Sequence, residues 1–234
     1  MSDQNDLIHG IHPVSEALKN PRRRLVALKA SKNAADRIAA EIAAAKIEPE
    51  IIHPRDLDRL LGAETVHQGL LLEAKPLAQP RLDQIEKSGI VVLLDQVTDP
   101  HNVGAILRTC AAFNVTALVA TARHSPEGSG VLFKSASGAY EHVPYVKVTN
   151  LSRAMAELKD YGFRIAGLDS EAPEPISSLD ATPPLALVLG AEGKGLRELT
   201  RKSCDHLVRL DLTGPIRSLN VSNAAAVALY ALPR

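Results

Sequence analysis

From about residue 84 onward, the hydrophobic positions follow two alternating patterns. Short apolar runs without polar alternation predict buried strands, and the segments between them carry apolar residues at helical spacing. Buried strands separated by helices indicate a parallel sheet that is covered on both faces. The predicted strands are 89–97, 117–121, 145–148, 163–169, 184–190 and 206–212, and the predicted helices are 102–114, 151–162, 196–205 and 218–232.

Residues 9–75 show a second, smaller set of alternating α and β elements. The predicted helices here are 12–20, 33–47 and 54–61, and the predicted strands are 24–30, 50–53 and 69–74. Residues 75–83 follow with two prolines, a composition typical of a linker. We therefore expect an α/β protein with an N-terminal domain at 1–74, a linker at 75–83 and a second domain at 84–234.

The charged residues balance, with 27 Lys+Arg against 27 Asp+Glu. A nucleic-acid partner would therefore have to meet a local basic patch. Arg22–Arg24 is a candidate, although an arginine run is more often a solvated turn. Aromatic residues make up 3% of the chain and Trp is absent, which argues against an aromatic platform for stacked bases.

The cysteines and the hydropathy pattern predict a cytoplasmic protein without a membrane partner. Cys110 and Cys204 lie far apart, and each falls in a helical pattern that favours a buried thiol in a reducing compartment. The chain starts with polar and acidic residues, unlike a signal peptide, and no apolar run approaches the roughly 20 residues that span a bilayer.

A glycine-rich loop follows the predicted strand 184–190. Gly190, Gly193 and Gly195 match neither the dinucleotide fingerprint nor the P-loop spacing. Glycines at the start of a helix still permit positive φ and close approach of a ligand to free N–H groups, although a tight turn explains them equally well. Glu192 in this loop either complements the helix dipole or binds a cation, and Arg108 is one candidate cation.

Two further stretches place polar side chains where helices begin. Asn102 suits the N-cap of the helix that carries Arg108, whose helical neighbours are small enough for the guanidinium to reach a pocket or a partner. In the last predicted helix, four polar side chains crowd the start, more than capping requires, which suggests a polar ligand or a buried network. These are Ser218, Asn220, Ser222 and Asn223.

Together these three stretches resemble the motifs of the SpoU/TrmH family of RNA ribose 2′-O-methyltransferases. The motifs are Asn-x-Gly-x-x-x-Arg at 102–108, Gly-x-Glu-Gly-x-Gly at 190–195 and Ser-Leu-Asn-Val-Ser at 218–222. Similar segments also occur at 10–18, 67–69 and 137–144, so the resemblance covers nearly the whole chain. It is strongest to the bacterial guanosine methyltransferases of large-subunit rRNA. One departure is Leu210-Asp211-Leu212, where the family often has Ile-Pro-Met.

The resemblance implies a fold and an activity. The fold would be a small ribosomal-protein-like RNA-binding domain followed by a parallel-sheet domain with a C-terminal trefoil knot, an exception to the rule against knotted chains. The activity would be S-adenosylmethionine-dependent methylation of a ribose 2′-hydroxyl in RNA, most simply a guanosine of 23S rRNA. Family members build the active site from two catalytic domains, so a homodimer is expected, and the small residues of 102–113 suit close helix packing.

The resemblance also implies roles for individual residues. Gly190, Leu210 and Leu219 would supply backbone contacts to S-adenosylmethionine. Arg108 would bind an RNA phosphate and stabilise the developing alkoxide, because an arginine pKa above about 12 makes a neutral guanidinium base costly. Glu192 would hold a cationic group.

Asn102 and Asn220 would orient the ribose and the helix starts, with Ser218 as a further candidate. No metal is implied, and His9 and His12, three residues apart, are expected as a surface pair without a metal. The open alternatives are a tRNA ribose methyltransferase and a non-catalytic RNA-binding assembly protein.

Overall fold

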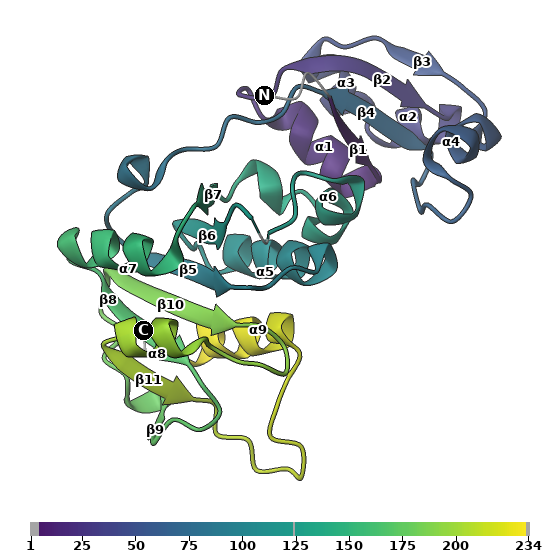
Figure 1. The fold of residues 1–234 in the computed structure, drawn as a ribbon. Helices are drawn as coiled ribbons and strands as arrows, with labels where there is room; N and C mark the ends of the chain where they lie inside the picture. The colour runs from purple at the N-terminus through teal and green to yellow at the C-terminus, as the bar shows by residue number, and fades with distance from the viewer. Residues whose placement is uncertain (1–4, 124, 233–234) are drawn as a thin grey trace.

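Two β-sheets follow one another along the chain, a four-stranded sheet and then a seven-stranded sheet (Figure 1). The computed structural model describes residues 5–123 and 125–232. The polar start of the chain, residues 1–4, lies outside the described residues. Within the described ranges, no helix is long and apolar enough to cross a membrane.

The N-terminal sheet has the order β1-β4-β2-β3, in which β4 pairs antiparallel with β1 and β2 while β3 pairs parallel with β2. Its strands are β1 (Asp6–His9), β2 (Leu25–Ala30), β3 (Pro49–Ile51) and β4 (Leu70–Ala74), and its helices are α1 (Ile11–Lys19), α2 (Lys32–Arg37), α3 (Ala39–Ala45) and α4 (Pro54–Leu61).

Two differences from the sequence prediction lie in this region. The single Ala-rich helix expected at 33–47 is wrong, because Ile38 leaves helical geometry (φ −122°) and buries its side chain between α2 and α3. The second difference is β1, which the sequence does not predict. Because β1 places His9 in a sheet, this side chain is 8% exposed, and the expected surface pair with His12 is wrong.

The large sheet is entirely parallel, with the order β7-β6-β5-β10-β8-β11-β9. Its strands are β5 (Ile90–Asp95), β6 (Ala117–Thr121), β7 (Tyr145–Val148), β8 (Arg164–Leu168), β9 (Glu174–Pro175), β10 (Leu185–Gly190) and β11 (His206–Arg209). The longer helices are α5 (Pro100–Ala112), α6 (Gly130–Ala136), α7 (Leu151–Asp160), α8 (Glu198–Ser203) and α9 (Val221–Ala231), and the 3-10 turns are η1 (Leu82–Gln84), η2 (Ala139–Glu141) and η3 (Ile176–Ser178). The parallel α/β fold predicted for this part is confirmed.

Both faces of the sheet are buried, which explains the absence of polar alternation along its strands. In β5, Val92 and Leu94 join the hydrophobic cluster that includes α5 and α9, whereas Val91 and Leu93 join the cluster with α7. The knot implied by the resemblance stays a prediction, with which the position of β10 between β5 and β8 agrees.

The Gly/Ser-rich segment before β7 contains α6, an element that the sequence does not predict. Gly104 of α5 allows α6 to pack closely, since a Cβ at Gly104 would lie 2.5 Å from Cβ of Ser135. The first glycine of the Asn-x-Gly motif therefore has a packing role.

Both cysteines are free thiols. Cys110 is buried in α5, as predicted, and Cys204 is half-buried at the end of α8, where its thiol donates to the carbonyl of Thr200. Burial raises the pKa of each thiol to about 12, so neither is a ready nucleophile.

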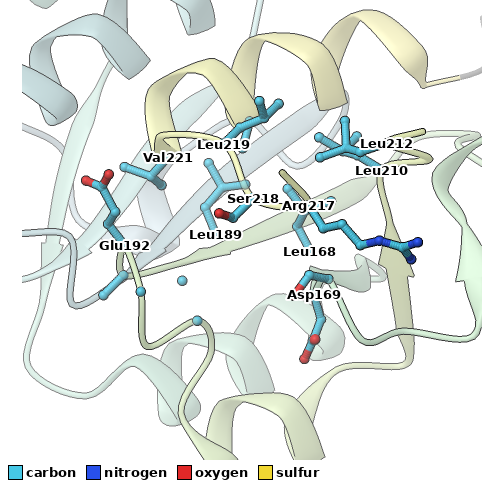
Figure 2. A pocket seen from close by; sticks show the side chains of 16 residues that line it. Leu168, Asp169, Leu189, Glu192, Leu210, Leu212, Arg217, Ser218, Leu219 and Val221 are labelled. Carbon is cyan, nitrogen blue, oxygen red and sulfur yellow. The ribbon is translucent and has the colours of Figure 1, made fainter. Parts of the chain in front are cut away.

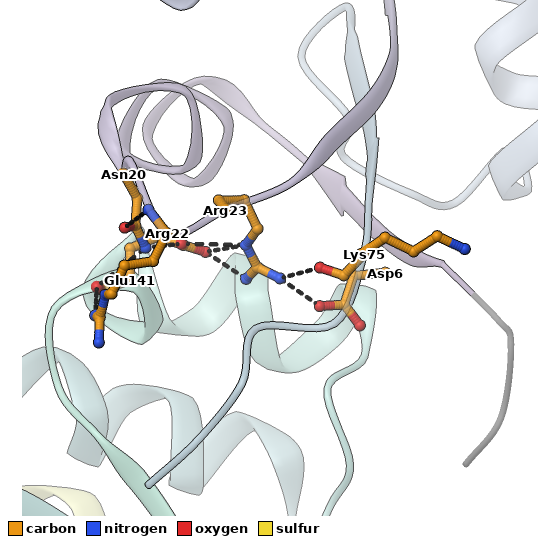
Figure 3. A network of polar contacts seen from close by, with 6 residues as sticks. All are labelled: Asp6, Asn20, Arg22, Arg23, Lys75 and Glu141. Carbon is orange, nitrogen blue, oxygen red and sulfur yellow. Dashed lines mark hydrogen bonds and ion pairs between the residues drawn. The ribbon is translucent and has the colours of Figure 1, made fainter.

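A buried arginine joins the two sheets' domains (Figure 3). Arg23 lies just before β2, and its side chain is fully buried. It donates to the carboxylate of Glu141 in η2 at 2.5 Å, to that of Asp6 at 2.6 Å and to the carbonyl of Lys75 at 3.1 Å. The guanidinium also lies near the rings of Phe133 and Tyr140, at 5.8 Å and 5.9 Å.

The expectation that the Arg22–Arg24 run binds RNA is therefore wrong for Arg23, whose donors are used inside the protein. Burial raises the pKa of Asp6, and the neighbouring Arg23 lowers it in turn. Removing the arginine would leave two carboxylates buried without their cation.

We expect Arg23→Ala to lower the free energy of unfolding by about 3–5 kcal/mol, because it strands the carboxylates of Asp6 and Glu141. Arg24→Ala is the matched control, since Arg24 is exposed, and it should change stability by less than about 0.5 kcal/mol. Urea denaturation followed by circular dichroism measures both. Equal effects of the two substitutions would show that the buried contacts add no stability.

Candidate functional site

A cavity of about 180 Å³ opens at the carboxyl ends of β8 and β10 (Figure 2). Three loops form it, those that follow β8, β10 and β11. Its lining residues are Leu168, Asp169, Ser170, Leu189, Gly190, Ala191, Glu192, Gly193, Gly195, Leu210, Leu212, Arg217, Ser218, Leu219, Val221 and Ala224. The second and third sequence motifs therefore meet in one hollow, as expected for loops at one edge of a parallel sheet.

The glycine-rich loop after β10 folds back on itself. The N–H of Gly195 donates to the carbonyl of Ala191 at 2.8 Å, and a Cβ at Gly190 would lie 2.2 Å from the carbonyl carbon of Gly195. Gly193 and Gly195 have positive φ values of 75° and 64°. The glycines are thus required by the turn itself, and the turn presents its backbone to the cavity.

A buried carboxylate holds the far end of this loop. Asp95, the last residue of β5, is fully buried and accepts from the backbone N–H of Arg197 at 2.9 Å and from its guanidinium at 2.6 Å. Asp95 also lies in register with Gly190 on the neighbouring strand. Sequence reasoning missed this pair, although a carboxylate at the end of a buried strand is a signal that could have found it.

The loop after β11 supplies the apolar side of the cavity. Figure 2 shows Leu210 and Leu212 at the end opposite Glu192, with Ser218 and Leu219 between them. The Leu-Asp-Leu departure from the family pattern keeps two apolar side chains in the lining. Ser218 is exposed and faces the cavity, and it caps no helix.

Three motif residues form a hydrogen-bonded group at the start of α9. The amide of Asn220 donates to the side-chain oxygen of Asn102 at 3.0 Å and to the carboxylate of Glu192 at 3.5 Å. Its own side-chain oxygen caps α9 by accepting from the N–H and hydroxyl of Ser222, at 2.9 Å and 2.6 Å. The first, second and third motifs therefore converge on one amide.

Two interpretations of single residues are corrected here. Asn102 is not the N-cap of α5, because Asp99 takes that position and accepts from the N–H of His101 at 3.0 Å. Glu192 forms no ion pair with Arg108 among the described residues, since its partner is the Asn220 amide.

Arg108 lies outside this cavity. It is exposed on α5, about 9 Å along the helix axis from Asn102, and no other described residue gives it a hydrogen bond or an ion pair. It lines a separate groove beside His12, Glu16 and His142. Within one chain, four of the five predicted catalytic residues therefore lie near one another, and Arg108 lies apart from them. The four are Asn102, Glu192, Ser218 and Asn220.

Two charged side chains that the sequence analysis did not single out also line the cavity. Asp169 follows β8 and is paired with Arg201 at 2.8 Å, and Arg217 extends from the loop after β11. Asp169 could have been found from its position, since it is the last residue of a predicted strand. Arg217 lies in an irregular loop, so its place in the sequence does not indicate that its side chain lines a cavity.

Comparison with known proteins finds family matches along nearly the whole chain. The profile of the SpoU rRNA Methylase family matches residues 89–230, and the profile described as "RNA 2'-O ribose methyltransferase substrate binding" matches residues 7–80. The chain belongs to the SpoU rRNA methylase family. A relative from Haemophilus influenzae, named 23S rRNA (guanosine-2'-O-)-methyltransferase RlmB, is 37% identical over 100% of this chain and 98% of its own length. The protein of the same name from Pseudomonas aeruginosa is 37% identical over 99% of this chain and 97% of its own length.

Solved structures share the fold of this SpoU methylase. The SpoU methyltransferase AviRb from Streptomyces viridochromogenes, solved with AdoMet, superposes with a TM-score of 0.83 over 97% of this chain and 89% of its own, at 24% identity. A TrmH/SpoU tRNA-modifying enzyme from A. aeolicus covers 65% of this chain and 75% of its own, with a TM-score of 0.55 and 28% identity.

Proposed function

We propose that this SpoU methylase transfers a methyl group from S-adenosylmethionine to a ribose 2′-hydroxyl of RNA, and that its substrate is a guanosine of 23S rRNA. The observation that carries the proposal is the convergence of all three motifs on the Asn220 amide, whose partner Glu192 lines the cavity. Family membership and the names of the full-length relatives support the reaction and the substrate. The proposed location is the cytoplasm, where rRNA is made in bacteria.

The cavity fits S-adenosylmethionine by its chemistry. Leucine, valine and alanine side chains offer an apolar surface for an adenine ring, while the glycine turn offers backbone donors and acceptors at its edge. Gly190, Leu210 and Leu219 are the proposed cofactor contacts. When bound, the sulfonium supplies an already activated methyl group, so the protein has to align the ribose and stabilise its oxygen.

We assign the hydrogen-bonded group to ribose positioning. Asn220 is fixed by capping α9, and its amide holds Asn102 and Glu192 in place. The carboxylate of Glu192 keeps a free oxygen for a cationic or hydroxyl group of the ligands. Ser218 faces the cavity from the same loop and offers one further hydroxyl.

Arg108 is assigned to an RNA phosphate and to the developing alkoxide, because no other described residue hydrogen-bonds or pairs with its exposed guanidinium. Since Arg108 lies outside the cavity of its own chain, we propose that a homodimer brings it to the cavity of the partner. The small residue Gly104 does not support the dimer, because it packs against α6 within the chain. Support comes from α9, where Val227 is 43% and Tyr230 is 74% exposed.

The N-terminal part is proposed as the RNA-selecting domain, residues 1–74, with 75–83 as its link to the catalytic domain, residues 84–234. The substrate-binding profile over residues 7–80 supports this division. Arg22 and Arg24 are exposed, unlike Arg23, and the guanidinium of Arg22 also donates to the carbonyl of Glu141 at 3.2 Å.

Methylation of rRNA is the direct test of the function. Incubated with tritiated S-adenosylmethionine and rRNA from a strain lacking the gene, the protein should label one 2′-hydroxyl of 23S rRNA, which primer extension at low nucleotide concentration will map. Labelling of tRNA instead would correct the substrate. Labelling of neither RNA, with no cofactor binding by calorimetry, would refute the proposal.

Gly190→Ala should weaken S-adenosylmethionine binding by about tenfold or more, because the new Cβ has to displace the backbone of Gly195. Gly214→Ala is the matched control, since a Cβ at Gly214 meets nothing within 4 Å. Calorimetry measures both affinities. Equal affinities for the two variants would mean that the fold-back of the loop does not shape the cofactor site.

Mixing two impaired variants, at a cofactor concentration too low to fill the Gly190→Ala cavity, tests the dimer and the role of Arg108 together. Arg108→Ala keeps its cavity and loses the guanidinium, whereas Gly190→Ala keeps the guanidinium and loses the cavity. A mixed dimer then holds one intact site, so activity should return after the two chains are exchanged. If the mixture stays inactive although light scattering shows mixed dimers, Arg108 acts within its own chain.

A further inference from the structure

The groove that holds Arg108 lies between the two domains. One wall is α1 of the N-terminal domain, with His12 and Glu16, and the other is the turn around η2, with Gly138 and His142. Gly138 allows the walls to meet, since a Cβ there would lie 2.5 Å from Cγ of Glu16. The groove therefore belongs to neither domain alone.

Further cations extend the groove along the surface of the N-terminal domain. A neighbouring hollow shares Glu16 and His142 with it and adds Lys19 and Arg22. Together, Arg108, His12, His142, Lys19 and Arg22 make a continuous row, which we call the interdomain groove. Arg108 and Arg22 are exposed at its two ends.

The one carboxylate among the described residues around Arg108 is neutralised. Glu16 accepts from Lys19 at 2.9 Å and from His142 at 2.7 Å, and these contacts lower the pKa of Glu16 against the effect of its burial. Glu141, in the neighbouring hollow, is buried and neutralised by Arg23. Each carboxylate that lines the two hollows is thus paired with a basic side chain, and a further carboxylate, that of Glu41, lies 3.6 Å from Lys19.

The shape of the groove is fixed before any ligand binds. The buried contacts of Arg23 hold η2 against the N-terminal domain, and Gln68 adds a second bridge by accepting from Lys134 of α6 at 2.7 Å and from the N–H of Ile11 in α1 at 3.1 Å. A preformed row of basic side chains suits an extended chain of phosphates, because little ordering is needed on the protein side.

We propose that the interdomain groove binds the sugar–phosphate backbone of the RNA strand next to the methylated nucleotide. The inference rests on the proposed function and adds to it a path for the substrate, from Arg108 across α1 to Arg22. Lys19 and His12 are the new RNA contacts, and both come from the N-terminal domain, as does Arg22. The same RNA strand would therefore contact both domains, so binding by the N-terminal domain would position the target ribose at the catalytic domain.

Salt-dependent RNA binding by the full-length protein tests the groove. Filter binding to unmethylated 23S rRNA is measured over a range of KCl concentrations for the wild type, Arg22→Ala, Glu16→Gln and Arg55→Ala. Arg22→Ala should weaken binding and reduce the slope of log K against log salt by about 0.7, the value for one phosphate contact to a single strand. Glu16→Gln should strengthen binding, because it removes a carboxylate from the groove and leaves Lys19 with only the longer contact to Glu41 among the described residues.

Arg55→Ala is the matched control, since Arg55 is exposed on α4 and lines neither hollow. It should leave the slope unchanged. If Arg22→Ala and Glu16→Gln both behave like this control while the wild type still methylates rRNA, the groove is not an RNA site and the proposed function stands. If the wild type transfers no methyl group to RNA, the proposed function fails whatever the groove variants do.

Directed cleavage gives a second readout that does not depend on affinity. An iron chelator attached to His12→Cys should cut 23S rRNA within a few nucleotides of the methylated ribose, and the same chelator on Arg55→Cys should not. Thermal unfolding and cofactor binding of each variant confirm that it is folded. Cuts at sites remote from the methylated ribose, or none, would overturn the proposed path.

Discussion

The parallel direction of all seven strands in the large sheet is the constraint on which the site depends. Because the strands run the same way, the loops after β8, β10 and β11 emerge at one edge and enclose a cavity without any contribution from the N-terminal sheet. The same constraint brings Asp95 of β5 beside Gly190 of β10, where the carboxylate holds the following loop.

Much of this arrangement follows from patterns in the sequence. Apolar runs without polar alternation identify the buried strands of the large sheet, and strand ends identify where ligand loops must lie. The motif resemblance then selects five cavity residues, namely Gly190, Glu192, Leu210, Ser218 and Leu219, and the structure places all five around one hollow. The local sequence pattern is sufficient to locate these residues because the common direction of the strands determines the edge of the sheet at which their loops lie.

The features that sequence reasoning missed depend on contacts between distant segments. In the sequence, Arg23 looks like one member of an exposed arginine run, because its partners Asp6 and Glu141 are close to it only in the folded chain. Ile38 breaks an otherwise regular helical pattern because its side chain is required in the core. Arg108 reads as part of the same motif as Asn102, yet helix geometry carries it two turns away into another groove. Such effects are decided by packing, which periodicity does not encode.

The buried guanidinium of Arg23 also determines which molecule has to deform when the proposed complex forms. Turning the N-terminal domain away from the catalytic domain would separate this buried cation from two carboxylates, at a cost of several kcal/mol. A hinge at this junction is therefore an unfavourable way to accommodate a substrate. In the proposed complex the protein would then act as a rigid template, and the RNA would bear the cost of unstacking the target nucleotide and bending its backbone. An RNA that is already irregular at that position would bind best, so recognition by such a template favours the shape of a loop over the sequence of a helix.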